Sequence, residues 1–287
     1  MPRQKQSVVM PSRKSLHIYE NWKVYSRQGK LMFRCNQKKA RWYLDRELAV
    51  KRDKEERAIQ LTFEAKGQGH DENDYMIEDR KNICVVCASQ AGLTLHHVVP
   101  YVYRQWFPLA IKSKSSRDLL LLCKECHDRY ERHATAFKKS LALEHGMPME
   151  GKGWIVIPEH RYMRKTASAL LSAANKMPVE RRQQLEQTIY EFWMQNASWE
   201  NLTWGQVLEK CAAFKDMERG PGFTEHGEGV VQHLMKNKYI TEEGNKERWP
   251  DLEKFIKQWR QHFLDHAQPH HLSSRWSVDS DIYTNGA

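Results

Sequence analysis

The stretch from residue 84 to residue 127 contains two Cys-x-x-Cys pairs, CVVC at 84–87 and CKEC at 123–126. The two-residue spacer lets both sulfurs of a pair face one ion, and two such pairs supply the four thiolates of a tetrahedral zinc site. Disulfides or a redox pair are the alternatives, but no secretion signal is recognised and neither pair resembles a thioredoxin motif. We therefore predict that Cys84, Cys87, Cys123 and Cys126 bind a structural zinc ion, whose binding free energy contributes to folding.

Three histidines accompany these cysteines. His96 and His97 are adjacent in the segment LHHVVP at 95–100, and His127 directly follows the second pair. An imidazole can accept a proton near neutral pH, and a cation held by neutral imidazoles can stabilise a phosphate and a leaving oxygen. Adjacent strand residues point to opposite faces, so His96 and His97 can share a site only where the backbone is irregular. Otherwise one of the two faces the core or the solvent.

This order of cysteines and histidines resembles the HNH (ββα-metal) endonucleases, in which two short strands and a helix surround a divalent cation. The resemblance implies that His96 and His127 bind a catalytic Mg²⁺ or Mn²⁺ ion and that His97 is the general base. At the position of the family's Asn, five residues before the third cysteine, this chain has Asp118. Asp118 can accept a hydrogen bond from an imidazole, but it also places negative charge beside a phosphate, so an active and an inactive site both stay open. Glu131 is a third candidate ligand, although we interpret it as a solvated helix residue.

Basic residues are frequent around this segment. The net charge of +10 and the pI of about 9.2 favour a polyanionic partner. The loop at 112–117 either contacts phosphate groups or is simply a solvated loop. The aromatic residues at 101–107 either stack on bases or, in the case of Trp106 and Phe107, pack in the core. We predict that phosphate groups of DNA or RNA contact four residues: Arg104, Lys112, Lys114 and Arg117.

The rest of the chain predicts an α+β protein. Residues 1–15 are expected to be a basic tail, and 16–80 a small α+β unit with a hairpin of strands at 22–26 and 31–35. In that unit Asn36 caps a helix at 37–50, and a strand follows at 59–63. The zinc-bound HNH-like module covers 81–145, and the region 146–287 is expected to be mainly helical. Its segments 180–196 and 251–266 repeat apolar residues at helical spacing. No apolar stretch reaches the length of a membrane span.

Several segments together resemble the C-terminal region of the exonuclease 3′–5′ domain-containing protein 2 family. They include KKARWYL at 38–44, NICVVC at 82–87, VPYVYRQWFP at 99–108, RDLLLLC at 117–123 and WRQHFL at 259–264. The resemblance implies a nucleic-acid enzyme inside the cell, nuclear or mitochondrial. Relatives carry a DEDD-type exonuclease ahead of this region, which this chain is expected to lack, so exonuclease activity is not transferred to it.

These patterns predict a metal-dependent HNH-type endonuclease that hydrolyses DNA or RNA. The alternative is a catalytically inactive, zinc-stabilised module that binds nucleic acid, and a protein-interaction scaffold is a third and weaker interpretation.

Overall fold

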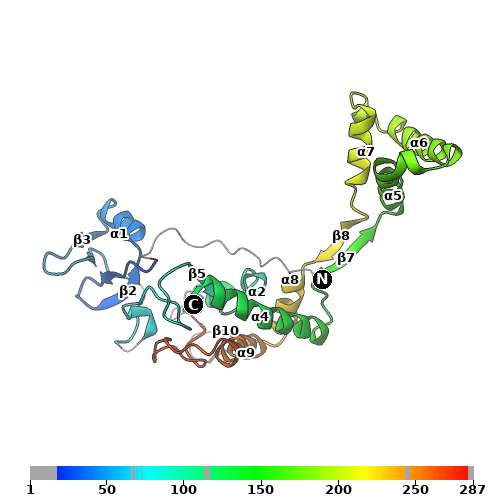
Figure 1. Ribbon diagram of the computed structural model, residues 1–287. Helices are drawn as coiled ribbons and strands as arrows, with labels where there is room; N and C mark the ends of the chain where they lie inside the picture. Colours follow the sequence, from blue (N-terminus) through cyan, green and yellow to red (C-terminus); the bar gives the residue numbers. More distant parts are fainter. Residues whose placement is uncertain are drawn as a thin grey trace. The chain divides into compact units, whose positions relative to one another are not determined.

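The computed structural model describes residues 18–65, 67, 69–72, 74–112, 117–242 and 246–283. The predicted basic tail at 1–15 lies outside these residues. The chain divides into two units: one contains the residues up to Met149 together with those from His226 onward, and the other is Glu150–Glu225 (Figure 1). The region 146–287, expected from the sequence to be one helical part, is thus shared between the two. None of the helices in the described segments is long and apolar enough to span a membrane.

A four-stranded sheet with the order β2-β1-β4-β3 begins the first unit. Strands β1 (Trp22–Tyr25) and β2 (Leu31–Cys35) form the predicted antiparallel hairpin. Strand β4 (Ala58–Leu61) pairs parallel with β1 and antiparallel with β3 (Ala49–Lys51). One face of this sheet packs on the helix that follows the hairpin.

That helix, α1 (Gln37–Leu44), starts where the sequence predicts, because the Asn36 side chain accepts a hydrogen bond from the Lys39 backbone N–H. The prediction that it continues to Val50 is wrong. Glu47 has a left-handed φ of 57°, and the chain turns there into β3. Pairing of β3 with β4 stabilises this segment as a strand although its sequence permits a helix.

Two antiparallel strands followed by a helix form the centre of the first unit. Strand β5 (Leu93–His97) pairs residue by residue with β6 (Leu119–Cys123), and α4 (Lys124–Glu144) begins directly after β6. The short helices α2 (Tyr101–Arg104) and α3 (Leu109–Lys112) lie between the strands in sequence. A 3₁₀ turn at Tyr75–Ile77 precedes this centre.

Helix α9 (Pro250–Ala267) packs against α4, as does α8 (His226–Leu234) (Figure 1). The predicted apolar stripe of α9 is confirmed, because Leu252, Phe255, Ile256, Trp259 and Phe263 are all buried in the core of the unit. A small hairpin of β9 (Tyr239–Ile240) and β10 (Glu247–Arg248) joins α8 to α9.

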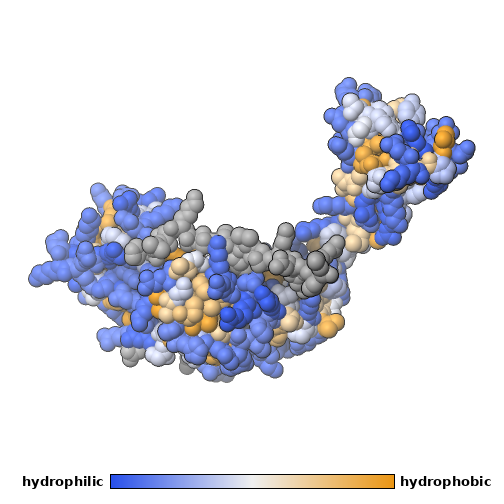
Figure 2. Space-filling view, viewed as in Figure 1, coloured by the Kyte–Doolittle hydropathy of each residue, from blue (hydrophilic) through white to orange (hydrophobic). Residues whose placement is uncertain are grey.

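The second unit has its own core. A ribbon of β7 (Lys152–Val156) and β8 (Met217–Thr224) leads to α5 (Pro158–Ala173), α6 (Val179–Met194) and α7 (Trp204–Ala212), with 3₁₀ turns at Ala174–Lys176 and Ala197–Trp199. The predicted helix at 180–196 corresponds to α6. Residues 150–225 contain ten basic and ten acidic side chains, so the excess positive charge belongs to the rest of the chain. Most of the visible surface is hydrophilic (Figure 2).

Candidate metal centres

Four cysteine sulfurs converge beside the β5–β6 hairpin. The Sγ atoms of Cys84, Cys87, Cys123 and Cys126 all lie within 4.8 Å of one another, and those of Cys87 and Cys123 are 3.7 Å apart. A zinc tetrahedron with arms of about 2.3 Å has edges of about 3.8 Å, whereas a disulfide brings two sulfurs to about 2.05 Å. The structure therefore brings the two predicted pairs together as free thiols, at a spacing that fits one tetrahedral ion.

The local backbone explains how the pairs meet. The Ala88 N–H donates to the Cys84 carbonyl, and Ala88 has a left-handed φ of 61°, which closes a tight loop around the first pair. The second pair spans the junction between β6 and α4, since Cys123 ends the strand and Cys126 lies in the first helical turn. An ion bound here would tie the loop, the strand and the helix together.

The electrostatics of the cysteines favour a cation. Burial raises the pKa of Cys123 and Cys126, so these thiols stay protonated at neutral pH unless a positive charge is present. The more exposed Cys87 has a lowered pKa, chiefly because the Ser89 backbone donates a hydrogen bond to it. A metal ion would deprotonate the buried thiols as it binds, as thiolate ligation requires.

A second group of metal-ligand type side chains lies on the other side of the β6–α4 junction. It consists of His96 from β5 and of His127 and Glu131 from successive turns of α4. His96 Nδ1 is 3.0 Å from His127 Nε2, and Glu131 Oε1 is 3.9 Å and 3.7 Å from these two atoms. Two imidazole nitrogens 3.0 Å apart can both ligate one ion at about 2.1 Å. The three donors therefore fit one cation, and Glu131 belongs to the group rather than to the solvated surface.

Thr94 fixes the tautomer of His127. Its hydroxyl donates its one proton to the Leu122 carbonyl at 2.8 Å, so at the 2.7 Å contact with His127 Nδ1 the imidazole must be the donor. The proton of a neutral His127 then lies on Nδ1, and the Nε2 lone pair points toward His96 and Glu131. Such outer hydrogen bonds commonly orient histidine ligands of metal ions.

The protonation states of the group suit a metal ion. Burial first, and then the neighbouring His127, lower the pKa of His96 to about 3, so that its imidazole is neutral at pH 7. The pKa of Glu131 is lowered chiefly by its contact with His127 and further by Lys138, whose Nζ is 3.6 Å away. Two imidazoles and one carboxylate are a donor set typical of transition-metal ions.

His97 does not join this group. The β5–β6 ladder is regular, with His96 opposite Leu120 and His97 opposite Leu119, so the two histidines point to opposite faces of the hairpin. The irregular backbone needed for both to share one face is not found in these strands. Burial and the Arg104 charge lower the pKa of His97 to about 4. Its Nδ1 is buried and has no hydrogen-bond partner among the described residues.

Asp118 lies in a buried ion pair. Arg260 of α9 donates to its two carboxylate oxygens from Nε at 3.0 Å and from Nη2 at 3.1 Å. Burial raises the pKa of Asp118, and the Arg260 charge opposes this rise. Among the described residues Asp118 accepts these bonds from Arg260, and no hydrogen bond to it from a histidine is found.

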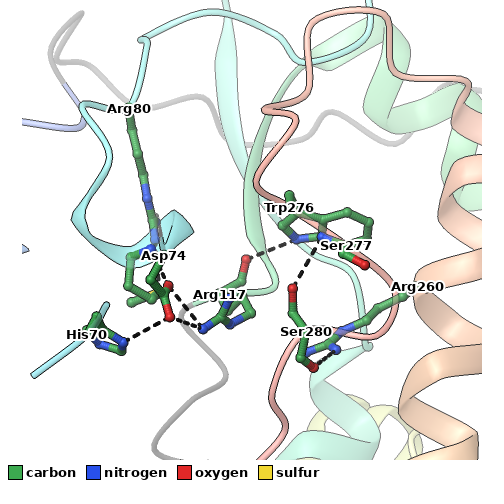
Figure 3. Close-up of polar contacts among 9 residues, drawn as sticks. His70, Asp74, Arg80, Arg117, Arg260, Trp276, Ser277 and Ser280 are labelled. Atoms are coloured by element: carbon green, nitrogen blue, oxygen red, sulfur yellow. Dashed lines mark hydrogen bonds and ion pairs between the residues drawn. The ribbon is translucent and has the colours of Figure 1, made fainter. Parts of the chain in front are cut away.

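Arg260 also fixes the C-terminal segment to the hairpin. Its Nη1 donates to the Val278 carbonyl and to the Ser280 carbonyl (Figure 3). Nearby, Trp276 Nε1 donates to the Arg117 carbonyl at 3.3 Å, so the segment contacts the residue next to Asp118 as well. Contacts with α9 and with the segment that follows it thus hold Arg117 and Asp118, the two residues that precede β6.

Three of the four predicted phosphate contacts lie among the described residues, and they differ in exposure. Arg117 is 4% exposed and donates to both oxygens of Asp74, which also contacts His70 (Figure 3). This burial gives no support to Arg117 as a phosphate contact. Lys112 is exposed and bonds to the Gln105 carbonyl, Arg104 lies near His97, and Lys114 is outside the described residues.

Three side chains of the site carry sequence signals that were missed or undervalued. Thr94 precedes His96 by two residues, so strand alternation places both on one face. Glu131 follows His127 by four residues, which places both on one helical face. Arg260 interrupts the apolar stripe of α9, and a charge at such a position indicates a buried partner.

Replacing Arg260 by Met should destabilise the protein by about 3–5 kcal/mol at neutral pH, because Asp118 would stay buried without its partner. The folded-state pKa of Asp118 would rise further above its unfolded value. The folded state would then bind more protons, so the loss of stability grows as pH increases above about 4 and is smaller in acid. Urea unfolding at several pH values measures this, with the exposed Arg275→Met as control. Equal stability of wild type and Arg260→Met at neutral pH would contradict it.

Sequence comparison adds a relationship to known proteins. Exonuclease 3'-5' domain-containing protein 2 from Homo sapiens is 32% identical over 265 residues, and the protein of that name from Drosophila melanogaster is 27% identical over 267, each covering 91% of this chain. Protein RRP6-like 3 from Arabidopsis thaliana is 34% identical over 199 residues, or 61% of the chain. This chain spans 40%, 43% and 22% of those proteins, respectively. No family model and no solved structure matches it.

Proposed function

Because the chain is homologous over 91% of its length to exonuclease 3'-5' domain-containing protein 2, we propose that it is a nuclease-related protein whose own site hydrolyses phosphodiester bonds as an HNH-type endonuclease. The observation that carries this proposal is the convergence of His96, His127 and Glu131 on one point beside the four cysteines. The name of that relative refers to an exonuclease domain, and a nucleic-acid substrate agrees with the excess positive charge of the first unit.

In this proposal the two metal centres have separate roles. A zinc ion on the four cysteines holds the hairpin to α4 and thereby fixes His127 relative to His96. The second centre would supply a cation that neutralises charge on the phosphate and on the leaving oxygen. His96, His127 and Glu131 hold that cation, and Thr94 keeps His127 in the tautomer that can ligate.

His97 is the proposed acceptor of a proton from the attacking water. Its imidazole is neutral at pH 7, since burial and Arg104 keep its pKa near 4. It ends β5 and points to the face opposite His96, so it and the metal group can act on one phosphate only at the end of the strand. The role requires the substrate to approach on the hairpin face that bears His97.

A noncatalytic nucleic-acid-binding module is the second candidate. Two observations favour it: Arg260 occupies both oxygens of Asp118, and the regular ladder directs His97 away from the metal group. Purified protein should be incubated with single- and double-stranded DNA and RNA in the presence of divalent ions. Cleavage by wild type and not by His97→Ala supports the nuclease with His97 as base. Binding without cleavage, with affinity falling steeply as salt rises, supports the binding module.

The donor set also predicts which ion supports activity. Imidazole ligands favour transition metals, whereas Mg²⁺ prefers oxygen donors and keeps much of its water. We expect half-maximal cleavage at an Mn²⁺ concentration at least about tenfold below that of Mg²⁺. A titration of cleavage rate against each ion tests this, and an equal or lower requirement for Mg²⁺ would contradict the assignment of the two histidines as ligands.

A further inference from the structure

A pocket of about 570 Å³ lies where the N-terminal sheet meets the β5–β6 hairpin. Phe33 and Lys39 line it from the sheet side, Leu95 and Leu119 from the hairpin, and Arg80 from the chain between them. This volume is within the range of small-molecule sites. All of these residues belong to the first unit.

The pocket lies on the face of the hairpin that bears His97. Leu119 is the cross-strand partner of His97, and Leu95 precedes His97 by two residues. Cross-strand partners and residues two apart share a face of a sheet, so all three side chains point the same way. A ligand resting on Leu95 and Leu119 would therefore lie on the same face of the hairpin as the proposed base.

The walls of the pocket combine an apolar surface with positive charge. Leu95, Leu119 and Phe33 are only partly buried, so they offer apolar area to a ligand. Lys39 Nζ lies 4.9 Å from the centre of the Phe33 ring, and the Arg80 guanidinium lies 5.3 Å from the Tyr19 ring. Among the described residues, neither Lys39 nor Arg80 forms an ion pair with a carboxylate. The Lys39 charge is thus available to an anionic ligand, and the Arg80 guanidinium, which also lies 4.6 Å from the centre of the Tyr75 ring and donates to Met76 Sδ, is not neutralised by a carboxylate.

The acidic and remaining basic groups of the pocket are already engaged. Glu20, the acidic residue among the described lining residues, accepts a hydrogen bond from the Gln37 backbone N–H. Arg34 pairs with Asp79 at 2.6 Å. Lys39, in contrast, is exposed, and an exposed cation–π contact is worth only about 0.5–1 kcal/mol. It can leave the Phe33 ring for a phosphate, and this would uncover the ring for stacking.

We propose that this pocket receives one unpaired nucleotide of a single-stranded nucleic acid. Its base stacks on Phe33 above Leu95 and Leu119, and the flanking phosphates contact Lys39 and Arg80. Single strands are generally recognised by stacking of their bases on aromatic side chains, combined with contacts between cationic side chains and the phosphate backbone. A base within a duplex cannot enter such a pocket unless it is flipped out, which costs a few kcal/mol. This inference rests on the proposed function, and it names single-stranded nucleic acid as the substrate class.

The test is binding by the full chain, without added divalent ions, to a short oligodeoxynucleotide that contains one 2-aminopurine. Anisotropy gives the affinity for the single strand and for the same strand in a duplex, and 2-aminopurine fluorescence reports stacking. Lys39→Glu is compared with Lys210→Glu, because Lys210 Nζ lies at the same 4.9 Å over an aromatic ring, that of Trp199, in the second unit. Phe33→Leu is compared with Phe223→Leu, whose ring contacts Arg219 in the second unit.

We expect the single strand to bind at least about tenfold more tightly than the duplex. Lys39→Glu should weaken single-strand binding about tenfold and lower the salt slope by about 0.7 or more, and Phe33→Leu should remove the stacking signal. The two control variants should behave as wild type. Equal affinity for single strand and duplex, or equal effects of Lys39→Glu and Lys210→Glu, would contradict nucleotide binding in this pocket. Neither result would bear on the proposed cleavage activity. Absence of binding to any nucleic acid would overturn both the pocket and the proposed function.

Discussion

Replacement of Cys123 by serine is expected to remove the bound zinc and to unfold the first unit at room temperature. Structural zinc sites contribute about 10–16 kcal/mol to folding, which is as large as the whole stability of about 5–15 kcal/mol of a typical domain. Here the ion would join the loop at Cys84, the end of β6 and the first turn of α4, so its loss separates the elements that form the core of the unit.

The matched control is Cys35→Ser, because Cys35 is a partly buried thiol of the N-terminal hairpin and lies outside the cysteine cluster. Zinc content measured by elemental analysis and thermal unfolding followed by circular dichroism give the result. Cys35→Ser should keep about one zinc ion per chain and its melting transition. The helices α5–α7 have a core of their own and should keep part of the helical signal in Cys123→Ser. A zinc-free Cys123→Ser protein with a wild-type melting curve would exclude a structural role for the site.

Replacement of His127 by alanine is expected to lower metal-dependent cleavage by at least about 100-fold while the zinc content stays unchanged. His127 supplies one of three donors, and its Nε2 is the atom nearest to His96 Nδ1. Its neighbour Cys126 belongs to the cysteine cluster, so ligands of the two centres are adjacent in the sequence but can be replaced one at a time. Cleavage rates on a single-stranded substrate in Mn²⁺ measure the effect.

Two further variants define the cause of that loss. Thr94→Val removes the hydrogen bonds to His127 Nδ1 and to the Leu122 carbonyl but no candidate ligand, and outer-sphere changes of this kind typically cost about 10- to 100-fold in metal affinity or activity. Higher Mn²⁺ concentrations should therefore rescue Thr94→Val but not His127→Ala. His133→Ala, which changes an exposed histidine of the same helix, should cleave at the wild-type rate. Full activity of His127→Ala would show that the nuclease site lies elsewhere or that the chain does not cleave.

Local patterns predicted the parts of the fold in which burial follows sequence periodicity. The apolar residues of α9 recur at helical spacing, and the hairpin of β1 and β2 is bounded by a glycine turn, so both were recognised. The end of α1 at Leu44 was not predicted, because it depends on the pairing of β3 with β4 and not on the residues of the helix. The separate unit at 150–225 was also missed, since the helical periodicity of α6 gives no information about its packing partners.

The cysteine spacing and the paired histidines identified most of the candidate site. The contact that changes the role of Asp118 could not be predicted, because Arg260 lies 142 residues further along the chain and no short pattern pairs the two. Glu131 was undervalued for a related reason. Its helical face was known, but whether that face meets His96 depends on how α4 packs on the hairpin. Adjacent histidines suggested a shared site, whereas the regular ladder assigns His96 and His97 to opposite faces.

The most direct measurement is a titration of the zinc-loaded protein with Mn²⁺, followed by electron paramagnetic resonance of the free ion. The proposal predicts about one Mn²⁺ bound per chain beside the zinc, with this binding lost in His127→Ala and kept in His133→Ala. It also predicts weaker binding in Glu131→Gln, because the carboxylate would no longer contribute its charge. Unchanged Mn²⁺ binding by His127→Ala, or no binding by wild type with its zinc in place, would contradict a catalytic metal centre formed by His96, His127 and Glu131.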